Sequence, residues 1–409
     1  MTDESIEREE EFNKPLNEML KSVVKEKLEK IMDNERQAFL AKEAPDDVAN
    51  GYYNRDWGTR FGEIEDLEVP RDREGEFNTK LFSPYQRRSG WLENLVIKMY
   101  SRGLSTRKIA NLLEEMYGTH YSSTTVSRIT DQTLEDVKEW RNRPLAKRYS
   151  VIFLDGMSFK LRRGSVANEV VYFAAGIDGE GYREMLGFWF GAEESSTVWK
   201  EILEELKERG VEEVLLIATD DLPGIKGAIA QSFPKADHQQ CVLHKVRNTT
   251  AKVRGTDEDE LTDDLKKIYE APDKEMAKGA FSNFKSKWEG TYPEVAESWE
   301  EDLPDLLTFM DYPYSIRQSI YTTNWLERTI KEFRRREKTM DSLPNPKAAK
   351  KLFYLLSKEQ SENWTKRRMR GFKKARDQLE EMFEERYGTN RNRQDQSARE
   401  ETSKIGNTQ

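Results

Sequence analysis

The segment VEEVLLIATDD, residues 211–221, constrains the fold more than any other stretch of this sequence. Its apolar residues run on without alternating with polar ones. A strand of this composition is buried on both faces, and such strands belong to parallel sheets that are covered by helices. We therefore expect a central strand of an α/β domain, with Asp220 and Asp221 at its end.

The segments around this strand predict the rest of one domain. VIFLDG, EVVYFAAGID and EMLGFWFGAEE are rich in β-branched and aromatic residues, which is typical of a three-stranded antiparallel meander. The helical pattern TVWKEILEELKERG precedes the central strand, another helix is expected near Pro223, and HQQCVLHKV is a candidate further strand. This order of elements is that of a ribonuclease H-like α/β domain.

The N-terminal region predicts helices and a small β element. Apolar residues recur at helical spacing from Asn13 to Ala41, which indicates an amphipathic helix that pairs with another subunit or packs on its own chain. Alternating runs and turn residues from Ala49 to Phe77 favour the small β element.

Three short helical patterns follow between Gly90 and Asp131. Gly103 and Ser105 separate the first two, and Gly118 with Ser122 or Ser123 separates the second from the third. This spacing resembles a helix-turn-helix, although such units also serve as plain packing modules. The third helix would present these side chains to a DNA groove: Ser123, Thr124, Thr125, Ser127 and Arg128.

The net charge of −9 argues against a protein that simply coats DNA, but the charges are unevenly distributed. Residues 328–376 hold 17 Lys and Arg against 5 Asp and Glu. This excess predicts a local surface for a polyanion, or alternatively a solvated charged helix. The single cysteine, Cys241, excludes an intrachain disulfide framework, and the absence of a signal-like or membrane-length apolar run predicts a soluble intracellular protein.

Two further parts of the chain have distinct compositions. Residues 250–321 are polar and helical in pattern, with Trp288 and Trp299 as expected packing anchors of a helical insertion. The tail after Tyr387 has too little apolar surface to fold and is expected to be disordered.

Asp155, Asp220 and Glu327 form a candidate catalytic set. The two aspartates follow apolar strands, and Glu327 lies near the start of a later helix. If the three carboxylates converge, a bound cation would relieve their repulsion, and hard oxygen ligands suit Mg²⁺ or Mn²⁺. Two such ions can promote displacement at a phosphodiester. The cations that follow Glu327 at helical spacing would hold the DNA backbone: Lys331, Arg334, Arg335 and Lys338.

Structural roles are open for each of these residues. Asn324 and Glu327 have the spacing of a capping box, and Asp155 before Gly156 could be a turn residue. Asp220 and Asp221 could cap the helix after Pro223. Trp325 and Trp364 could stack on bases, or pack in the core as most tryptophans in helices do.

Several ordered motifs resemble one known family. They are NGYYNRDWGTRFGEIEDLEVPRDREGEF, YSRGLSTRKIANLLEEMYG with TTVSRIT, FLDGMSFK, ATDDLPGIKGAI, QQCVLHKVRN and TTNWLERTIKEFRRREK. From about Asn50 to Lys374 the chain resembles the prokaryotic Mutator-type insertion-sequence transposases.

This resemblance implies a DDE transposase with a ribonuclease H-like domain that an all-helical insertion interrupts. It implies Asp155, Asp220 and Glu327 as the metal-binding triad, two Mg²⁺ or Mn²⁺ ions, and terminal inverted repeats and target DNA as partners of a homodimer or higher oligomer. Cys241 and His244 match the family's C-x-x-H motif, whose role we leave open between a structural or DNA-positioning function and, with His238, a metal site. Two positions depart from the family: Asp221 replaces a small residue, and Ile330 replaces a frequent Asn.

The segments expected from this reading are 1–48 (amphipathic helix), 49–145 (β element and helix-turn-helix), 146–250 (catalytic domain, first part), 251–320 (helical insertion), 321–387 (glutamate helix and basic helices) and 388–409 (tail). Two other functions remain as alternatives: a catalytically inactive DNA-binding protein derived from a transposase, and a ribonuclease H-like nuclease.

Overall fold

The computed structural model describes residues 3–59, 62–81, 90–117, 121–162, 166–191, 196–340 and 343–388. The chain divides into two compact units, residues 1–134 and 135–409. The expected disordered tail lies outside the described residues, except for Gly388. Within the described ranges, no helix has the length and apolar character needed to cross a bilayer.

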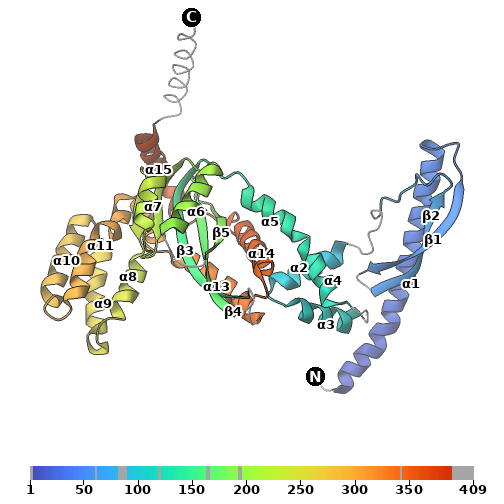
Figure 1. Cartoon of the computed structure of the whole chain (residues 1–409), viewed down its shortest axis with the longest axis horizontal. Helices are drawn as coiled ribbons and strands as arrows, with labels where there is room; N and C mark the ends of the chain where they lie inside the picture. The colour runs from blue at the N-terminus through green and yellow to red at the C-terminus, as the bar shows by residue number, and fades with distance from the viewer. Residues whose placement is uncertain are drawn as a thin grey trace, which may run out of the picture. The chain divides into compact units, whose positions relative to one another are not determined.

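The first unit begins with a long helix that packs against a β-hairpin (Figure 1). Helix α1 (Asp3–Lys42) covers strands β1 (Ala49–Thr59) and β2 (Gly62–Asp72), which pair antiparallel. Met32 of α1 is fully buried against Trp57 and Leu67 of the hairpin. Of the two expectations for the amphipathic helix, packing on its own chain is therefore the one seen, and the small β element is confirmed.

Three short helices complete the first unit, as the sequence predicts. They are α2 (Gly90–Ser101), α3 (Thr106–Tyr117) and α4 (Ser123–Asp131). Gly103 takes the left-handed conformation with φ of +88°, and Ser105 accepts a hydrogen bond from the backbone of Lys108. Ser122 caps α4 by accepting from the backbone of Thr125, whereas Gly118 lies outside the described residues.

The second unit is built on a five-stranded mixed sheet in the order β5-β4-β3-β6-β7. The antiparallel meander is confirmed: β4 (Val166–Ile177) pairs with both β3 (Arg148–Arg162) and β5 (Arg183–Gly191). The central strand is confirmed too, since β6 (Glu213–Thr219) is buried throughout and lies parallel to β3. Its other neighbour is the short parallel strand β7 (Asp237–Gln240).

Two strand predictions are corrected. HQQCVLHKV is only partly strand, because helix α8 (Val242–Thr250) begins directly after β7 and buries Val242 and Val246 at helical spacing. Strand β3 does not end at Asp155. It pairs with β4 as far as Arg162, so Asp155 lies inside a continuous strand and is not a turn residue.

Helices cover both faces of the sheet. On one face, α6 (Ser196–Glu208) and α7 (Ile225–Ser232) pack against Ile152 and Leu154 of β3. On the other face lie α13 (Asn324–Thr339) and α14 (Pro346–Trp364), whose Phe333 and Phe353 contact Phe173 of β4. Side chains alternate between the faces of a strand, so Asp155 points to the same side as Phe153, toward α13.

Helices between α8 and α13 form the expected polar, helical segment. They are α9 (Gly255–Tyr269), α10 (Lys274–Trp288), α11 (Pro293–Leu306), the 3₁₀ turn η1 (Thr308–Asp311) and α12 (Tyr314–Ile320). Helices α9, α10 and α11 lie side by side (Figure 1). Trp288 and Trp299 are buried packing anchors, and their indoles donate to Asp264 and Thr249. The remaining described helices are α5 (Thr133–Asn142) and α15 (Phe372–Tyr387).

Candidate active site

Asp155 is a buried carboxylate in the middle of the sheet, with only 4% of the residue exposed. Leu154 of β3 pairs with Thr219, the last residue of the parallel strand β6. Asp155 follows Leu154 and Asp220 follows Thr219, so the two aspartates come from neighbouring positions of adjacent strands. Burial raises the pKa of Asp155 well above its usual value, and repulsion from Asp220 and Glu327 adds to this. Its Oδ2 has no hydrogen-bond partner among the described residues. Such an atom is costly unless a ligand or cation meets it.

Asp220 faces the loop and helix that follow the helical insertion. Its Oδ1 accepts a hydrogen bond from Thr323 Oγ1 at 2.8 Å and lies 2.8 Å from His244 Nδ1. Helix α7 begins only at Ile225, with Gly224 as its N-cap, so the carboxylate of Asp220 does not cap it. Asp221 is exposed.

Glu327 lies in the first turn of α13, where Thr323 is the N-cap residue. Its carboxylate contacts Arg247 Nη1 at 3.0 Å and Lys331 Nζ at 2.5 Å. Burial tends to raise the pKa of Glu327, but the hydrogen bonds from Lys331 and Arg247 outweigh it and lower the pKa. The capping-box interpretation is wrong, because Asn324 is not the N-cap residue and its side chain accepts from Arg247 instead.

His244 lies between two of the acids. Its Nδ1 faces Asp220, and its Nε2 lies 3.9 Å from Glu327 Oε2. Burial alone would lower the pKa of His244, but the hydrogen bonds to Asp220 and Cys241 outweigh it and raise the pKa to about 10. A histidine cation here partly neutralises the carboxylates and fixes their positions. Sequence reasoning left this role open; the signal was the three-residue spacing from Cys241, which is one turn of helix.

Cys241 is buried beside this histidine and forms a second possible metal-binding group. Its Sγ lies 3.2 Å from His244 Nδ1, and the ligand atoms of Asp220, Cys241 and His244 all lie within 4.8 Å of one another. Burial tends to raise the pKa of the thiol, but hydrogen bonds from His244 and Thr323 lower it. His238 does not join this group, because it contacts Thr219 and Asp305.

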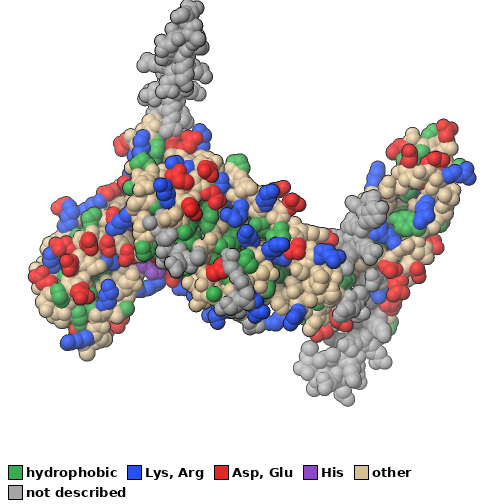
Figure 2. Space-filling model, in the orientation of Figure 1, with side chains coloured by type: hydrophobic (Ala, Val, Ile, Leu, Met, Phe, Trp, Pro, Cys, Tyr) green, Lys and Arg blue, Asp and Glu red, His purple; other side chains and the backbone are tan. Residues whose placement is uncertain are grey.

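The predicted cations of α13 have mixed surroundings. Lys331 pairs with Glu327, and Arg335 pairs with Glu332 at 2.5 Å. Arg334 donates to the backbone oxygen of Ser158 at 2.6 Å, and with Lys338 it lines a hollow of about 440 Å³. Figure 2 shows Lys and Arg side chains in blue beside the purple of a histidine on the second unit, in the area where Figure 1 labels α8.

The two tryptophans of this region belong to the packing. Trp325 meets Trp364 edge-on at 5.3 Å between ring centroids, and it meets Phe153 at 4.8 Å. Trp364 is buried. Ile330 is fully buried on the same helix, so its departure from the family pattern fits the core rather than the acid cluster. Base stacking by these tryptophans therefore has no support in their surroundings.

In the first unit, α4 exposes two of the five residues predicted for a DNA groove. Thr124 and Arg128 are exposed, whereas Ser123, Thr125 and Ser127 are half-buried. The hydroxyl of Thr125 contacts that of Ser122, the N-cap. An exposed arginine beside a short polar helix face is compatible with phosphate or base contact.

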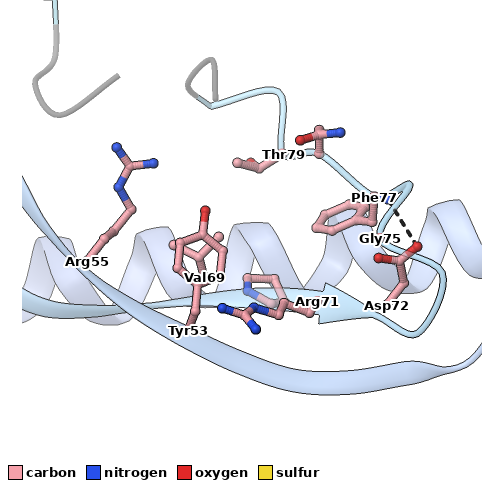
Figure 3. A pocket seen from close by; sticks show the side chains of 10 residues that line it. Tyr53, Arg55, Val69, Arg71, Asp72, Gly75, Phe77 and Thr79 are labelled. Carbon is pink, nitrogen blue, oxygen red and sulfur yellow. Dashed lines mark hydrogen bonds between the residues drawn. The ribbon is translucent and has the colours of Figure 1, made fainter. Parts of the chain in front are cut away.

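The hairpin of the first unit carries a small hollow of about 220 Å³ (Figure 3). In Figure 3 the Tyr53 ring rises from the strand and the Phe77 ring reaches in from the loop, and the guanidinium of Arg71 lies 4.8 Å from the centre of the Tyr53 ring. Asp72 accepts hydrogen bonds from the backbone of Glu76 and Phe77. The carboxylate of Asp72 is therefore occupied by the fold itself.

Comparison with known proteins identifies relatives over most of the chain. Residues 2–367 match the family described as "Transposase, Mutator family". The transposase of the insertion sequence element IS905 from Lactococcus lactis is 36% identical, covering 90% of this chain and 96% of its own. The transposase of IS256 in transposon Tn4001 from Staphylococcus aureus is 30% identical, covering 85% and 91%.

A likeness to a solved structure is much weaker. The Drosophila P element transposase strand transfer complex matches at 13% identity with a TM-score of 0.31, covering 78% of this chain and 83% of that one. A score this low carries no argument about the fold or the site.

Proposed function

The chain belongs to the Mutator family of transposases and is a transposase of the insertion-sequence type, and from this premise we propose that Asp155, Asp220 and Glu327 are its catalytic carboxylates. Transposases cleave and transfer DNA strands. The finer proposal is a DDE enzyme whose mixed sheet is a ribonuclease H-like domain. It acts on the terminal inverted repeats of its element and on target DNA.

One observation carries this proposal: a buried carboxylate oxygen of Asp155 has no hydrogen-bond partner within the described part of the chain, and burial together with Asp220 and Glu327 raises the pKa of this group. These oxygens fit a hard divalent cation. We propose that the three acids hold Mg²⁺ or Mn²⁺, as two ions. Bound there, the ions would activate the attacking oxygen and stabilise the leaving oxygen of a phosphodiester.

The neighbouring cations act on the carboxylates. His244 holds Asp220 through its Nδ1 and faces Glu327 through its Nε2. Arg247 and Lys331 hold the Glu327 carboxylate from two sides. We propose that these groups position the acids, and that DNA is bound by α4 in the first unit and by exposed cations of residues 328–376 in the second. Pairing two element ends requires a homodimer or higher oligomer.

A thermal unfolding experiment tests the metal site. Mn²⁺ at about 100 times its dissociation constant should stabilise the wild type by roughly 2.7 kcal/mol. The gain should be lost in Asp155→Asn and Asp220→Asn and kept in Asp221→Asn, which changes the exposed neighbour. If Mn²⁺ stabilised Asp155→Asn fully and Cys241→Ser not at all, the cation would instead belong to the group of Asp220, Cys241 and His244.

His244→Ala should lower cleavage about 10- to 100-fold, the usual effect of losing a side chain that orients metal ligands. His238→Ala is the matched control, because this histidine contacts Thr219 and Asp305 and, among the described contacts, none of the three acids. The measurement is the rate of metal-dependent nicking of a labelled end duplex. Equal rates for His244→Ala and wild type would remove His244 from the positioning role.

A further inference from the structure

A second hollow in this unit lies outside the acid cluster. It has a volume of about 790 Å³ and lies between the end of α9, the η1–α12 segment and the start of α15. This volume is in the usual range for small-molecule sites. Its walls combine aromatic rings with Arg317 and three cations of residues 328–376, and the proposed function gives the aromatic rings no role.

The aromatic wall includes an unusually exposed ring. Tyr314, the first residue of α12, is 81% exposed. The guanidinium of Arg317 lies 5.6 Å from its ring centre and is held by backbone oxygens of Pro272, Met310 and Tyr312. The ring is thus backed by a fixed cation while most of its surface meets solvent.

Two more tyrosines extend this wall. Tyr269 of α9 stacks on Tyr321 with ring centroids 6.3 Å apart and an interplanar angle of 22°. Both line the hollow with Tyr314. Aromatic faces presented in this way are platforms on which bases stack.

Other residues that line the hollow are cationic. Arg370, Lys373 and Lys374 line it and are exposed, and they surround Gly371, the N-cap of α15. The positive end of that helix dipole adds to their field. With Arg317 the hollow holds four cations against one acid, Glu270. This balance favours an anionic ligand.

The hollow is connected to the acid cluster by a short stretch of backbone. The carbonyl of Tyr321 accepts a hydrogen bond from the backbone of Val242, beside Cys241. Two residues later, Thr323 donates to Asp220. Tyr321 of the aromatic wall and Thr323 of the acid cluster are therefore two residues apart in the protein chain. A DNA strand that leaves the acid cluster would meet the aromatic wall nearby.

We propose that this hollow binds an unstacked nucleotide of single-stranded DNA, with the base on Tyr314 and the phosphates at Arg370, Lys373 and Lys374. The inference rests on DNA as the substrate of the proposed function. It adds a site for a strand that is unpaired around cleavage, which neither the acid cluster nor α4 supplies.

Fluorescence anisotropy with a labelled 20-nucleotide oligothymidylate and a 20-base-pair duplex tests the proposal. Tyr314→Ala should weaken single-strand binding about 5- to 150-fold, the range for loss of one stacked base, and leave duplex binding within about two-fold. Tyr314→Trp should restore it. The double variant Lys373→Ala, Lys374→Ala should lower the slope of log affinity against log salt by about 1.4.

Two control variants match these changes. Met276→Ala removes a large side chain that is 57% exposed on α10, and Lys200→Ala removes an exposed lysine of α6. Neither should alter single-strand binding. Unchanged single-strand binding by Tyr314→Ala, or an equal loss for the duplex, would overturn the proposal. So would a loss of self-association in Tyr314→Ala by light scattering with single-strand binding unchanged, which would assign the surface to a second copy.

The catalytic proposal can fail separately. Asp155→Asn should bind the oligothymidylate as the wild type does. If Asp155→Asn still cleaved while Tyr314→Ala lost single-strand binding, the acid triad would be wrong and the nucleotide site would stand.

Discussion

Asp155→Asn is expected to reduce strand cleavage and strand transfer by roughly 10³-fold or more while element ends remain bound. Asparagine keeps the size of the side chain but removes the negative charge that a divalent cation requires. Because the change is buried in a paired strand, the fold should persist. In a buffer without divalent ions the variant should be more stable, by about 0.5–2 kcal/mol, since it relieves the repulsion with Asp220 and Glu327.

The measurement is gel analysis of a labelled end duplex with Mg²⁺, together with a mobility shift for binding. Glu327→Gln should likewise lose cleavage and keep binding to the element ends. Asp221→Asn should cleave at the wild-type rate. Cleavage by Asp155→Asn at the wild-type rate would exclude Asp155 from the chemistry. Binding without cleavage by the wild type would favour the inactive DNA-binding alternative, and cutting without preference for ends would favour the nuclease.

Gly371→Ala is expected to destabilise the second unit by about 3 kcal/mol or more. Gly371 has φ of +88°, where a side chain costs roughly 1–2 kcal/mol. A Cβ at this position would also lie 1.8 Å from the backbone oxygen of Ser315. Backbone cannot move aside as a flexible side chain does, so α15 would have to shift away from α12.

Urea denaturation followed by circular dichroism measures this loss as a lower midpoint. Gly388→Ala is the control: its φ is +82°, but no atom of the described residues lies within 4 Å of the added Cβ. It should cost only the conformational part, about 1–3 kcal/mol, because its ψ of 158° lies in a region that glycine alone readily adopts. Equal losses for the two variants would show that the contact between Gly371 and Ser315 does not hold the helices together.

The order of the strands and helices in the second unit could be predicted from local patterns. The unbroken apolar run of β6 is typical of a strand buried on both faces, and the β-branched and aromatic residues of β3 to β5 are typical of strands. The end of β3 could not be predicted in this way. Its extension past Asp155 depends on pairing with β4 up to Val166, and pairing between distant residues leaves little trace in a single sequence.

The candidate site was predictable as residue types but not as contacts. Acids after buried strands pointed to Asp155 and Asp220. That His244 faces both Asp220 and Glu327 depends on how α8 and α13 pack, and those helices are separated in sequence by the whole helical insertion. Similarly, the sequence predicts that Arg334 and Lys331 are available to bind DNA. In the fold, Arg334 donates to the backbone oxygen of Ser158 and Lys331 pairs with Glu327.

The separation of Glu327 from the other two acids has a consequence for how the protein is made. During synthesis, β3, β6 and α8 leave the ribosome first, and α9 to α12 follow before α13. A nascent chain thus already carries α4, the helix that we propose binds DNA, while its third acid is still being translated. We expect that a polypeptide terminated between α8 and α13 would occupy element ends without cutting them, and would act as a competitor of the full-length protein.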